Sequence, residues 1–347
     1  MKKLFSLFLA LVLLLGVMVV PATADGFTVG QLSFLNLSED DNYALNITMQ
    51  VPMIKLLFLH GLWVANEDAP VIGNASFRYY DTLNSLLMGL QAGEVNCIQV
   101  PGFTGKYLCA TNDGLMIREE YHLEKASGIT EIAVNMMSDG YSFLLKKEHT
   151  ELRDAIDAQI TAMKEDGTLQ QLIDEHINKV TEGGEPVAVE FEQFEGDPIK
   201  VGVTGDLPPM DYMSADGSFA GFNTAVLAEI GKRLQKNIEL VQVDSVARSL
   251  ALAEGRVDMV FWTRGASETL AKRTRENGVP SKEELEALSA ELRETLTEEE
   301  IAILEEAGEP DPEKIVQRDL RDMPADTIVT QPYYTDCPVW VCLKDAK

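Results

Sequence analysis

The sequence has 347 residues, 46% of them hydrophobic, and a formal net charge of -27. This length and hydrophobic content support a substantial core and allow two lobes or two domains. The excess of acidic residues argues against nucleic acid or an anionic membrane as a partner, since both need a basic surface. Much of the acid lies in residues 283–313, so the net charge is a poor guide to the charge of a ligand.

The first 24 residues have the organisation of a secretory signal peptide. A basic start, Met1-Lys-Lys, precedes an apolar run at 4–20 and the small-residue site Ala22-Thr-Ala24. We expect cleavage after Ala24 and a periplasmic or secreted protein. The alternative is a retained membrane anchor, although the apolar run is at the short end of spanning length. No cysteine lies near the cleavage site, which argues against a lipoprotein anchor.

The first half of the mature chain alternates strand and helix patterns. Phe27–Asn36 alternates as a strand, Ser38 is a candidate helix N-cap, and residues 43–64 are apolar enough to be largely buried. The next predicted elements are a strand, a helix and a strand, at 77–80, 83–91 and 95–100.

Residues 199–264 repeat that alternation. The predicted elements are strands at 199–203, 238–243 and 257–262 and helices at 222–234 and 246–253. Strands that alternate with helices predict a parallel sheet. Leu90-Gln-Ala-Gly-Glu-Val-Asn96 also matches Leu252-Ala-Glu-Gly-Arg-Val-Asp258, so one pattern is used twice.

The segment Ser267–Ala325 carries two capping boxes, Ser281-x-x-Glu284 and Thr297-x-x-Glu300, each of which predicts the start of a helix. We expect a helical-hairpin insertion. It is either a docking surface or lid, or a solvated acidic projection without such a role. Pro332-Tyr-Tyr334 and a predicted strand, Pro338–Leu343, follow it.

Together these motifs resemble a known family. The runs 201–210, 216–223 and 251–260, in this order, are similar to the first lobe of the family 3 solute-binding proteins that serve ABC importers, and Pro332-Tyr-Tyr334 resembles the segment before that family's hinge. The resemblance covers roughly 198–264 and 324–347. It implies an α/β, periplasmic-binding-protein-like two-lobe clamshell with mixed, mainly parallel sheets, which captures a small polar solute for a membrane ABC permease.

The two halves stand in reversed order, because 27–178 resemble the family's C-terminal half and 198–347 its N-terminal half. One interpretation is a circularly permuted clamshell with lobes at 25–180 and 198–347, an insertion at about 267–325 and a linker at 181–197. In it, Pro338–Leu343 would run beside the hinge strand Tyr141–Lys146. The other interpretation is a fragment of a tandem protein whose second domain lacks its distal lobe.

Open α/β sheets bind ligands at the carboxyl ends of their strands, here the loops after Val203, Phe261 and Val100. The candidate ligand-binding residues in these loops, with one from the opposite lobe, are Asp206, Met210, Tyr212, Trp262, Thr263, Arg264, Thr104 and Ser38.

Each candidate also has a structural alternative. Arg264 has the geometry to clamp a carboxylate or phosphate, or it pairs with a neighbouring acid. Trp262 and Tyr212 offer flat walls to a ligand, or they are core aromatics. Ser38 precedes a helix start that suits an anion, or it is a plain N-cap.

Departures from the family put its usual ligand in doubt. The family's Arg for an α-carboxylate is replaced by Leu270, its acid for an α-ammonium by Pro101, and its usual aromatic by Met210. A free α-amino acid held in the usual way is therefore not expected, and Arg264 or Arg273 are the candidate substitutes for the missing Arg.

No catalytic or metal-binding motif is present. The four histidines, His60, His122, His149 and His176, do not form a His-Glu-x-x-His array. The sequence also contains neither a Gly-x-Ser-x-Gly nucleophile elbow nor a P-loop. We expect a monomer without enzymatic activity, cofactor, metal or nucleic-acid partner. The second hypothesis is a ligand-free sensor or interaction protein that docks a partner with the acidic insertion.

The sequence has four cysteines, Cys97, Cys109, Cys337 and Cys342. Four cysteines can pair fully in three different ways. Cys337 and Cys342 are about 16 Å apart on one extended segment, which is too far for a bridge without a bend. The sequence leaves open both the pairing and the alternative of buried free thiols.

Overall fold

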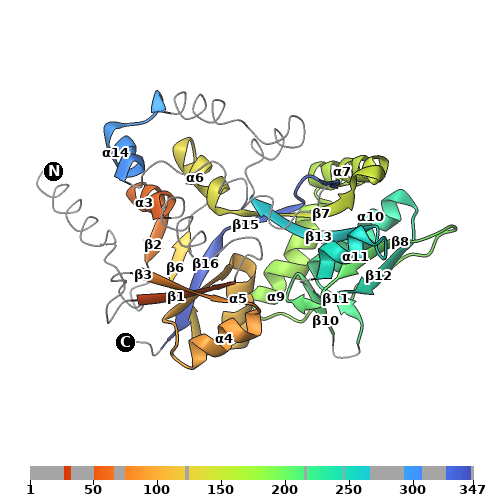
Figure 1. Ribbon diagram of the computed structural model, residues 1–347, viewed down its shortest axis with the longest axis horizontal. Helices are drawn as coiled ribbons and strands as arrows, with labels where there is room; N and C mark the ends of the chain where they lie inside the picture. The colour runs from red at the N-terminus through yellow and green to blue at the C-terminus, as the bar shows by residue number, and fades with distance from the viewer. Residues whose placement is uncertain are drawn as a thin grey trace, which may run out of the picture.

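The computed structural model describes residues 27–32, 51–65, 75–121, 125–214, 217–244, 247–265, 293–306 and 326–344. These residues form two α/β lobes that lie side by side, each around its own mixed sheet (Figure 1). The fold class expected from the sequence is thus confirmed. The predicted signal peptide at 1–24 lies outside the described residues. Among the helices that are described, none is long and apolar enough to cross a membrane.

The first lobe contains a five-stranded sheet in the order β3-β1-β4-β16-β5. Its strands are β1 (Phe27–Leu32), β3 (Ala75–Tyr80), β4 (Cys97–Pro101), β5 (Leu115–Ile117) and β16 (Pro338–Leu343). On one face, α4 (Leu83–Gln91) and α5 (Gly102–Thr111) pack; Leu86 and Leu90 of α4 contact the strand residues Ile98 and Val341. The first lobe also contains α3 (Val51–Leu59), α6 (Ile129–Met137) and a ribbon of β2 (Trp63–Ala65) with β6 (Glu119–Tyr121), and α3 packs with α6 in a separate cluster.

The second lobe contains a six-stranded sheet, β12-β8-β13-β7-β14, with β15 also on β7. Its strands are β7 (Asp139–Lys146), β8 (Ile199–Val203), β12 (Ile238–Gln242), β13 (Met259–Gly265), β14 (Thr327–Val329) and β15 (Tyr334–Asp336). A small sheet of β9 (Asp206–Leu207), β10 (Asp211–Met213) and β11 (Phe219–Ala220) adjoins it.

Helices cover both faces of this second sheet. On one face, α7 (Thr150–Glu165), α8 (Thr168–Ile173) and α10 (Phe222–Leu234) enclose Phe143 and Phe261; on the other, α11 (Arg248–Ala253) places Leu252 on Val260. The remaining helical segments are the 3-10 turn Lys147–His149, the π-helix Asp174–Asn178 and α9 (Lys179–Thr181). After α9, the chain has no helix or strand from 182 to 198, a stretch that contains nearly all of the linker predicted at 181–197.

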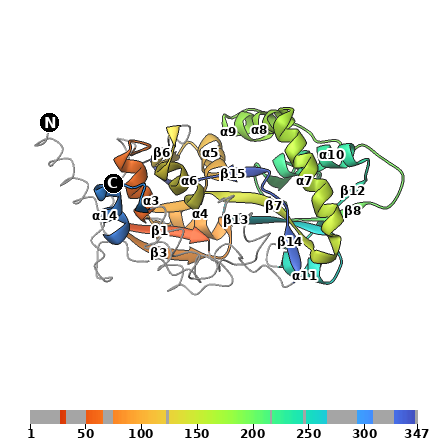
Figure 2. The same cartoon turned by 90° about the horizontal axis from the view of Figure 1, so that it is seen from above.

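The same strand arrangement is built in both lobes. In each, three parallel strands lie in the orders β3-β1-β4 and β12-β8-β13, and an antiparallel strand follows. That fourth strand comes from the other half of the sequence, since β7 precedes the linker and lies in the second sheet, whereas β16 ends the chain and lies in the first. Figure 2 shows β7 and β13 extending between the lobes. A cut of the sequence at the linker 181–197 would therefore not separate the two lobes, because each sheet takes one strand from the other side of that linker.

One pairing predicted from the sequence is wrong. Pro338–Leu343 does not run beside Tyr141–Lys146; as β16 it pairs with β4 and β5, and the shorter strand β15 pairs with 139–141 instead. The alternation of β16 explains this placement, because Val339 and Val341 point into the core beneath α4.

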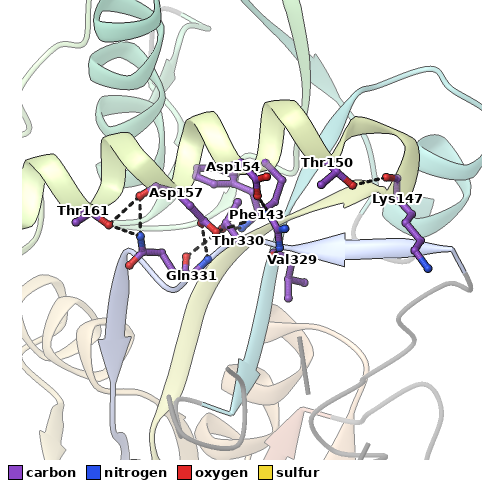
Figure 3. Close-up of polar contacts among 10 residues, drawn as sticks. Phe143, Lys147, Thr150, Asp154, Asp157, Thr161, Val329, Thr330 and Gln331 are labelled. Atoms are coloured by element: carbon purple, nitrogen blue, oxygen red, sulfur yellow. Dashed lines mark hydrogen bonds and ion pairs between the residues drawn. The ribbon is translucent and has the colours of Figure 1, made fainter. Parts of the chain in front are cut away.

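The segment that carries the chain from the second lobe back to the first is tied to β7 and α7 (Figure 3). Thr330 donates its backbone N–H to the Phe143 carbonyl (2.9 Å) and accepts the Phe143 N–H on Oγ1 (2.9 Å). The Gln331 amide nitrogen Nε2 donates to the Asp157 carbonyl and to Thr161 Oγ1, both at 2.7 Å. These bonds hold Thr330 and Gln331, where the chain leaves the second lobe, against β7 and α7.

Replacing Gln331 with alanine is expected to lower the free energy of unfolding by roughly 1–2 kcal/mol. The variant loses three side-chain hydrogen bonds to α7, because Nε2 donates two and Oε1 accepts one from Lys164 Nζ (3.2 Å). Urea denaturation measures the change. The matched control is Gln170→Ala, whose exposed amide bonds only Asp174 on the same helical surface (3.0 Å) and should cost less than about 0.5 kcal/mol. An equal loss of unfolding free energy in the two variants would show that the Gln331 hydrogen bonds to α7 contribute no special stability.

Part of the predicted insertion is described. Helix α14 (Glu298–Glu306) begins with the predicted capping box, in which Glu300 donates its N–H to Thr297 Oγ1 (3.2 Å) and accepts the Thr297 N–H on Oε2 (2.7 Å). Glu300 is buried, and its Oε1 lies 3.1 Å from Nε2 of His60, the residue that follows α3. This helix therefore packs on the first lobe. The other predicted box, Ser281-x-x-Glu284, lies outside the described residues.

Candidate ligand-binding site

The N-terminus of α5 meets the crossing segment where the two lobes join. Phe103 donates its backbone N–H to Oδ2 of Asp336 (2.9 Å). Gly102 allows this approach, because a Cβ at that position would lie 2.7 Å from Asp336 Oδ1 and 2.8 Å from the Cys337 carbonyl oxygen. The carboxylate thus sits at a helix N-terminus, where free N–H groups and the helix dipole favour negative charge.

Burial nevertheless dominates the electrostatics of Asp336. It raises the pKa of this carboxyl to about 7, against the opposing effects of the Phe103 and Gly102 N–H groups and of Lys106. Asp139 faces Asp336 across the β15–β7 pair and raises the pKa further. The side chain keeps some exposed surface. A carboxylate in this state is well suited to bind a cationic group, which relieves the cost of its burial.

Aromatic rings from both lobes surround this carboxylate. Phe103 of α5 contacts Tyr141 edge-on with ring centroids 5.3 Å apart, and Tyr334 lies 6.1 Å from Phe103 and 5.9 Å from Tyr141. Phe222 closes the group, 5.5 Å from Tyr334. Burial and Asp336 raise the pKa of Tyr334, so its hydroxyl stays protonated at neutral pH. The rings offer flat apolar and π surfaces next to a negative charge.

Two residues predicted from the sequence approach the same region from opposite lobes. Tyr212 is half-buried in β10, and burial together with the nearby Tyr107 of α5 raises its pKa. Thr104 lies one turn before Tyr107 on α5. Its side chain is only 1% exposed, and its Oγ1 has no hydrogen-bond partner. We call the set the junction site: Phe103, Thr104, Tyr141, Tyr212, Tyr334 and Asp336.

Trp262 lies in the core on the opposite face of the second sheet. It is 6% exposed and packs under α11, with the Arg248 guanidinium 5.8 Å from its ring centroid. Its Nε1 lacks a partner, as does Oγ of Ser142, which stands opposite it on β7. The alternation of β13 puts Phe261 rather than Trp262 on the face of the aromatic rings.

The remaining predicted residues lie at various distances from this site. Asp206 is exposed at the start of β9, Met210 is fully buried in the second-lobe core, and Thr263 is half-buried opposite Tyr141. Arg264 pairs with Gly140 through its backbone, but its side chain lies outside the described structure, as does Ser38. Ligand contact by these residues stays a prediction.

Sequence reasoning missed Asp336, although a signal was present. The family's acid is absent at Pro101, and Asp336 lies beside that position, since Pro101 pairs with Pro338 across β4 and β16. Asp336 stands between Pro332-Tyr-Tyr334 and the predicted strand Pro338–Leu343, and neither motif includes it. The place of Asp336 beside α5 depends on the pairing of β15 with β7, and no local sequence pattern predicts that pairing.

Comparisons with known proteins give one partial family match and several distant structural likenesses. Residues 199–275 match the bacterial extracellular solute-binding proteins, family 3. A zinc-bound ligand-binding component of an ABC-type import system from Staphylococcus aureus is 10% identical, with a TM-score of 0.33 over 89% of this chain and 86% of that chain. A phosphate-binding protein of a phosphate ABC transporter from Streptococcus pneumoniae is 12% identical, with a TM-score of 0.32 over 93% and 91%.

A mutant of the protein ArgBP from T. maritima is 9% identical, with a TM-score of 0.30 over 92% of this chain and 82% of that chain. All three TM-scores are low, and the ligands in these names belong to those proteins. No curated protein sequence matches the chain. Within the described ranges, no three His, Cys, Asp or Glu side chains are grouped so that they could hold a metal ion.

Proposed function

We propose that this chain is an exported, monomeric solute-binding protein that captures a small polar solute for a membrane ABC importer. The observation that carries the proposal is the junction site, where a largely buried carboxylate and aromatic rings from both lobes converge. The family match over 199–275 supports the same function. The exchange of β7 and β16 between the lobes supports the permuted arrangement over a tandem fragment, because each sheet is completed by the other half of the sequence.

The junction site favours a solute with a primary or secondary ammonium group, an amino acid or a related amine. Asp336 would accept the ammonium N–H groups, and Tyr141 and Tyr334 would contact its carbon skeleton or the cation itself. A solute that contacts Phe103 of the first lobe and Tyr212 of the second binds most tightly when the lobes are close together. Binding would therefore shift the population toward a closed state that a permease can recognise.

Isothermal titration and thermal unfolding of residues 25–347 test the proposal against amino acids, polyamines, short peptides and dicarboxylates. We expect one amine-bearing class to bind and to raise a single unfolding transition by several degrees. Asp336→Asn should lower the affinity for that solute about tenfold or more, whereas Asp113→Asn, at an exposed acid outside the candidate site, should leave it unchanged. Absence of binding to every class, or two independent transitions, would overturn the proposal.

A second candidate function is that of a ligand-free sensor or interaction protein that uses the insertion. The packing of α14 on α3 favours it, since Glu300 is turned inward while Glu298 and Glu305 remain exposed. Under this alternative no solute stabilises the protein, and charge reversal at Glu298 and Glu305 abolishes co-purification of a basic partner. Under the first proposal the same reversal leaves solute binding intact.

A further inference from the structure

Two of the four cysteines stand directly opposite each other in the first sheet. Cys97 on β4 and Cys342 on β16 are Cα partners of one antiparallel ladder. Directly opposed residues in such a ladder have Cα atoms about 4.5–5.5 Å apart, which lies within the range that a disulfide spans. The two residues therefore meet the Cα separation that a disulfide requires.

The thiols also point to the same side of the sheet and touch. Both side chains are fully buried in one cluster with Phe27, Val29 and Trp340. A hydrogen bond joins the two thiols, which raises the pKa of Cys97 and lowers that of Cys342. The Arg118 guanidinium, stacked near Phe27 and Trp340, also lowers the pKa of Cys342.

The other two cysteines are placed less favourably. Cys109 on α5 packs with Val339 and Val341, on the opposite face of β16 from Cys342, so a bond between them would have to pass through the sheet. Burial raises the pKa of Cys109 to about 11, which disfavours its thiolate. Cys337 lies in a separate cluster with α3 and α6. The strand register thus selects one pairing among those that the sequence leaves open.

We propose that Cys97 and Cys342 form an intramolecular disulfide that fastens the C-terminal strand to the first lobe. The oxidant is a protein or small-molecule disulfide, RSSR. The thiolate of one of the two cysteines attacks one sulfur of RSSR and expels RS⁻, and the thiolate of the other then attacks the mixed disulfide and expels the second RS⁻. The two cysteines lose two protons and two electrons in total, and RSSR becomes two RSH. Because both thiols are buried in the folded protein, the exchange occurs before β16 docks or during local opening.

This bond would close a loop of 246 residues, from residue 97 to residue 342 (342 − 97 + 1). Restriction of the unfolded ensemble grows with loop length, so a bridge over this span is expected to raise the melting temperature by about 5 °C or more. The inference rests on the strand register and on the shared buried cluster of the two thiols, and it stands whether or not the chain binds a solute.

Refolding of the reduced chain in a glutathione redox buffer, followed by alkylation and mass measurement, tests the proposal. Without reduction, two of the four thiols should resist alkylation. Trypsin leaves Cys97 on the peptide 79–106 but Cys337 and Cys342 together on 322–344, so the assignment is made in Cys337→Ser, where the two peptides must still be linked. Cys109→Ser should also keep the bond, whereas Cys97→Ser and Cys342→Ser should lose it.

Thermal unfolding of oxidised and reduced wild-type protein gives a readout that does not depend on the folding of any variant. The oxidised protein should unfold at the higher temperature. Four alkylated thiols after refolding in oxidised glutathione, a link from the 79–106 peptide to the Cys109 peptide, or equal melting temperatures of the two forms would overturn the proposal.

Discussion

At pH 8 the Asp336→Asn variant should unfold at a higher temperature than the wild type, and at pH 4 the two proteins should unfold together. The folded-state pKa of Asp336, about 7, exceeds its ordinary value of 3.8. Stability contributed by the protonated carboxyl is therefore fully present below pH 3.8 and is lost as pH rises through about 7. Asparagine imitates the protonated form and accepts the Phe103 N–H, so the variant should gain roughly 2 kcal/mol or more at pH 8.

The same substitution should remove affinity for the amine solute, which separates a binding carboxylate from a helix cap. In the wild type, affinity should fall about tenfold for each pH unit below about 7, because binding then requires loss of one proton from Asp336. Calorimetric titrations between pH 5 and 8 measure this slope. A stabilised variant that binds as tightly as the wild type would show that Asp336 only caps α5.

The charged neighbours of Asp336 provide a control for that pH dependence. Asp139 on β7 raises its pKa, and Lys106 on α5 lowers it. Asp139→Asn should consequently move the midpoint of the binding profile to lower pH, and Lys106→Gln should move it to higher pH. Unmoved midpoints in both variants would mean that another group controls the titration.

Elements with strong periodicity could be predicted from the sequence to the residue. The strand 199–203, the helices 83–91 and 222–234 and the strand 338–343 have the bounds that the structure gives. Their partners could not be predicted in the same way. Whether Pro338–Leu343 lies on β7 or on β4 depends on which core receives Val339 and Val341, and both strands are equally apolar locally.

The candidate site was predictable in part for the same reason. The rule that ligands bind at the carboxyl ends of parallel strands selected Thr104 and Tyr212, which lie on α5 of the first lobe and β10 of the second, and ligand contact by them stays a prediction. It also selected Trp262, whose strand alternation places it on the other face. Asp336 lies on an antiparallel strand, to which that rule does not apply, so only the tertiary structure brings its carboxylate to α5.

Gly221 explains one of the motifs behind the family resemblance. Its backbone, at φ 107° and ψ 177°, adopts a conformation open almost only to glycine. A Cβ there would lie 2.6 Å from the carbonyl oxygens of both Pro209 and Met210. Those carbonyls accept the first N–H groups of α10, from Phe222 (3.0 Å) and Asn223 (2.8 Å). Gly221 thus lets the helix start directly against the turn that follows β8.

Gly221→Ala should lower the free energy of unfolding by about 3 kcal/mol or more, because backbone strain adds to a clash with carbonyls that cannot move without breaking the start of α10. The control is Gly217→Ala, which also has a positive φ, 84°, but has no neighbouring atom within 4 Å of the new Cβ. It should cost only about 1–2 kcal/mol from strain.

The consequence for function follows from Asn223. Its side chain accepts the hydroxyl of Tyr333 (2.8 Å), the residue before the junction-site ring Tyr334. Displacing the start of α10 moves this acceptor away from a phenol buried beside the junction site, so Gly221→Ala should weaken solute binding under conditions in which the protein remains folded. Urea denaturation and titration at low temperature measure the two effects. Equal destabilisation by both glycine variants, with binding unchanged, would mean that the helix start and the junction site are independent.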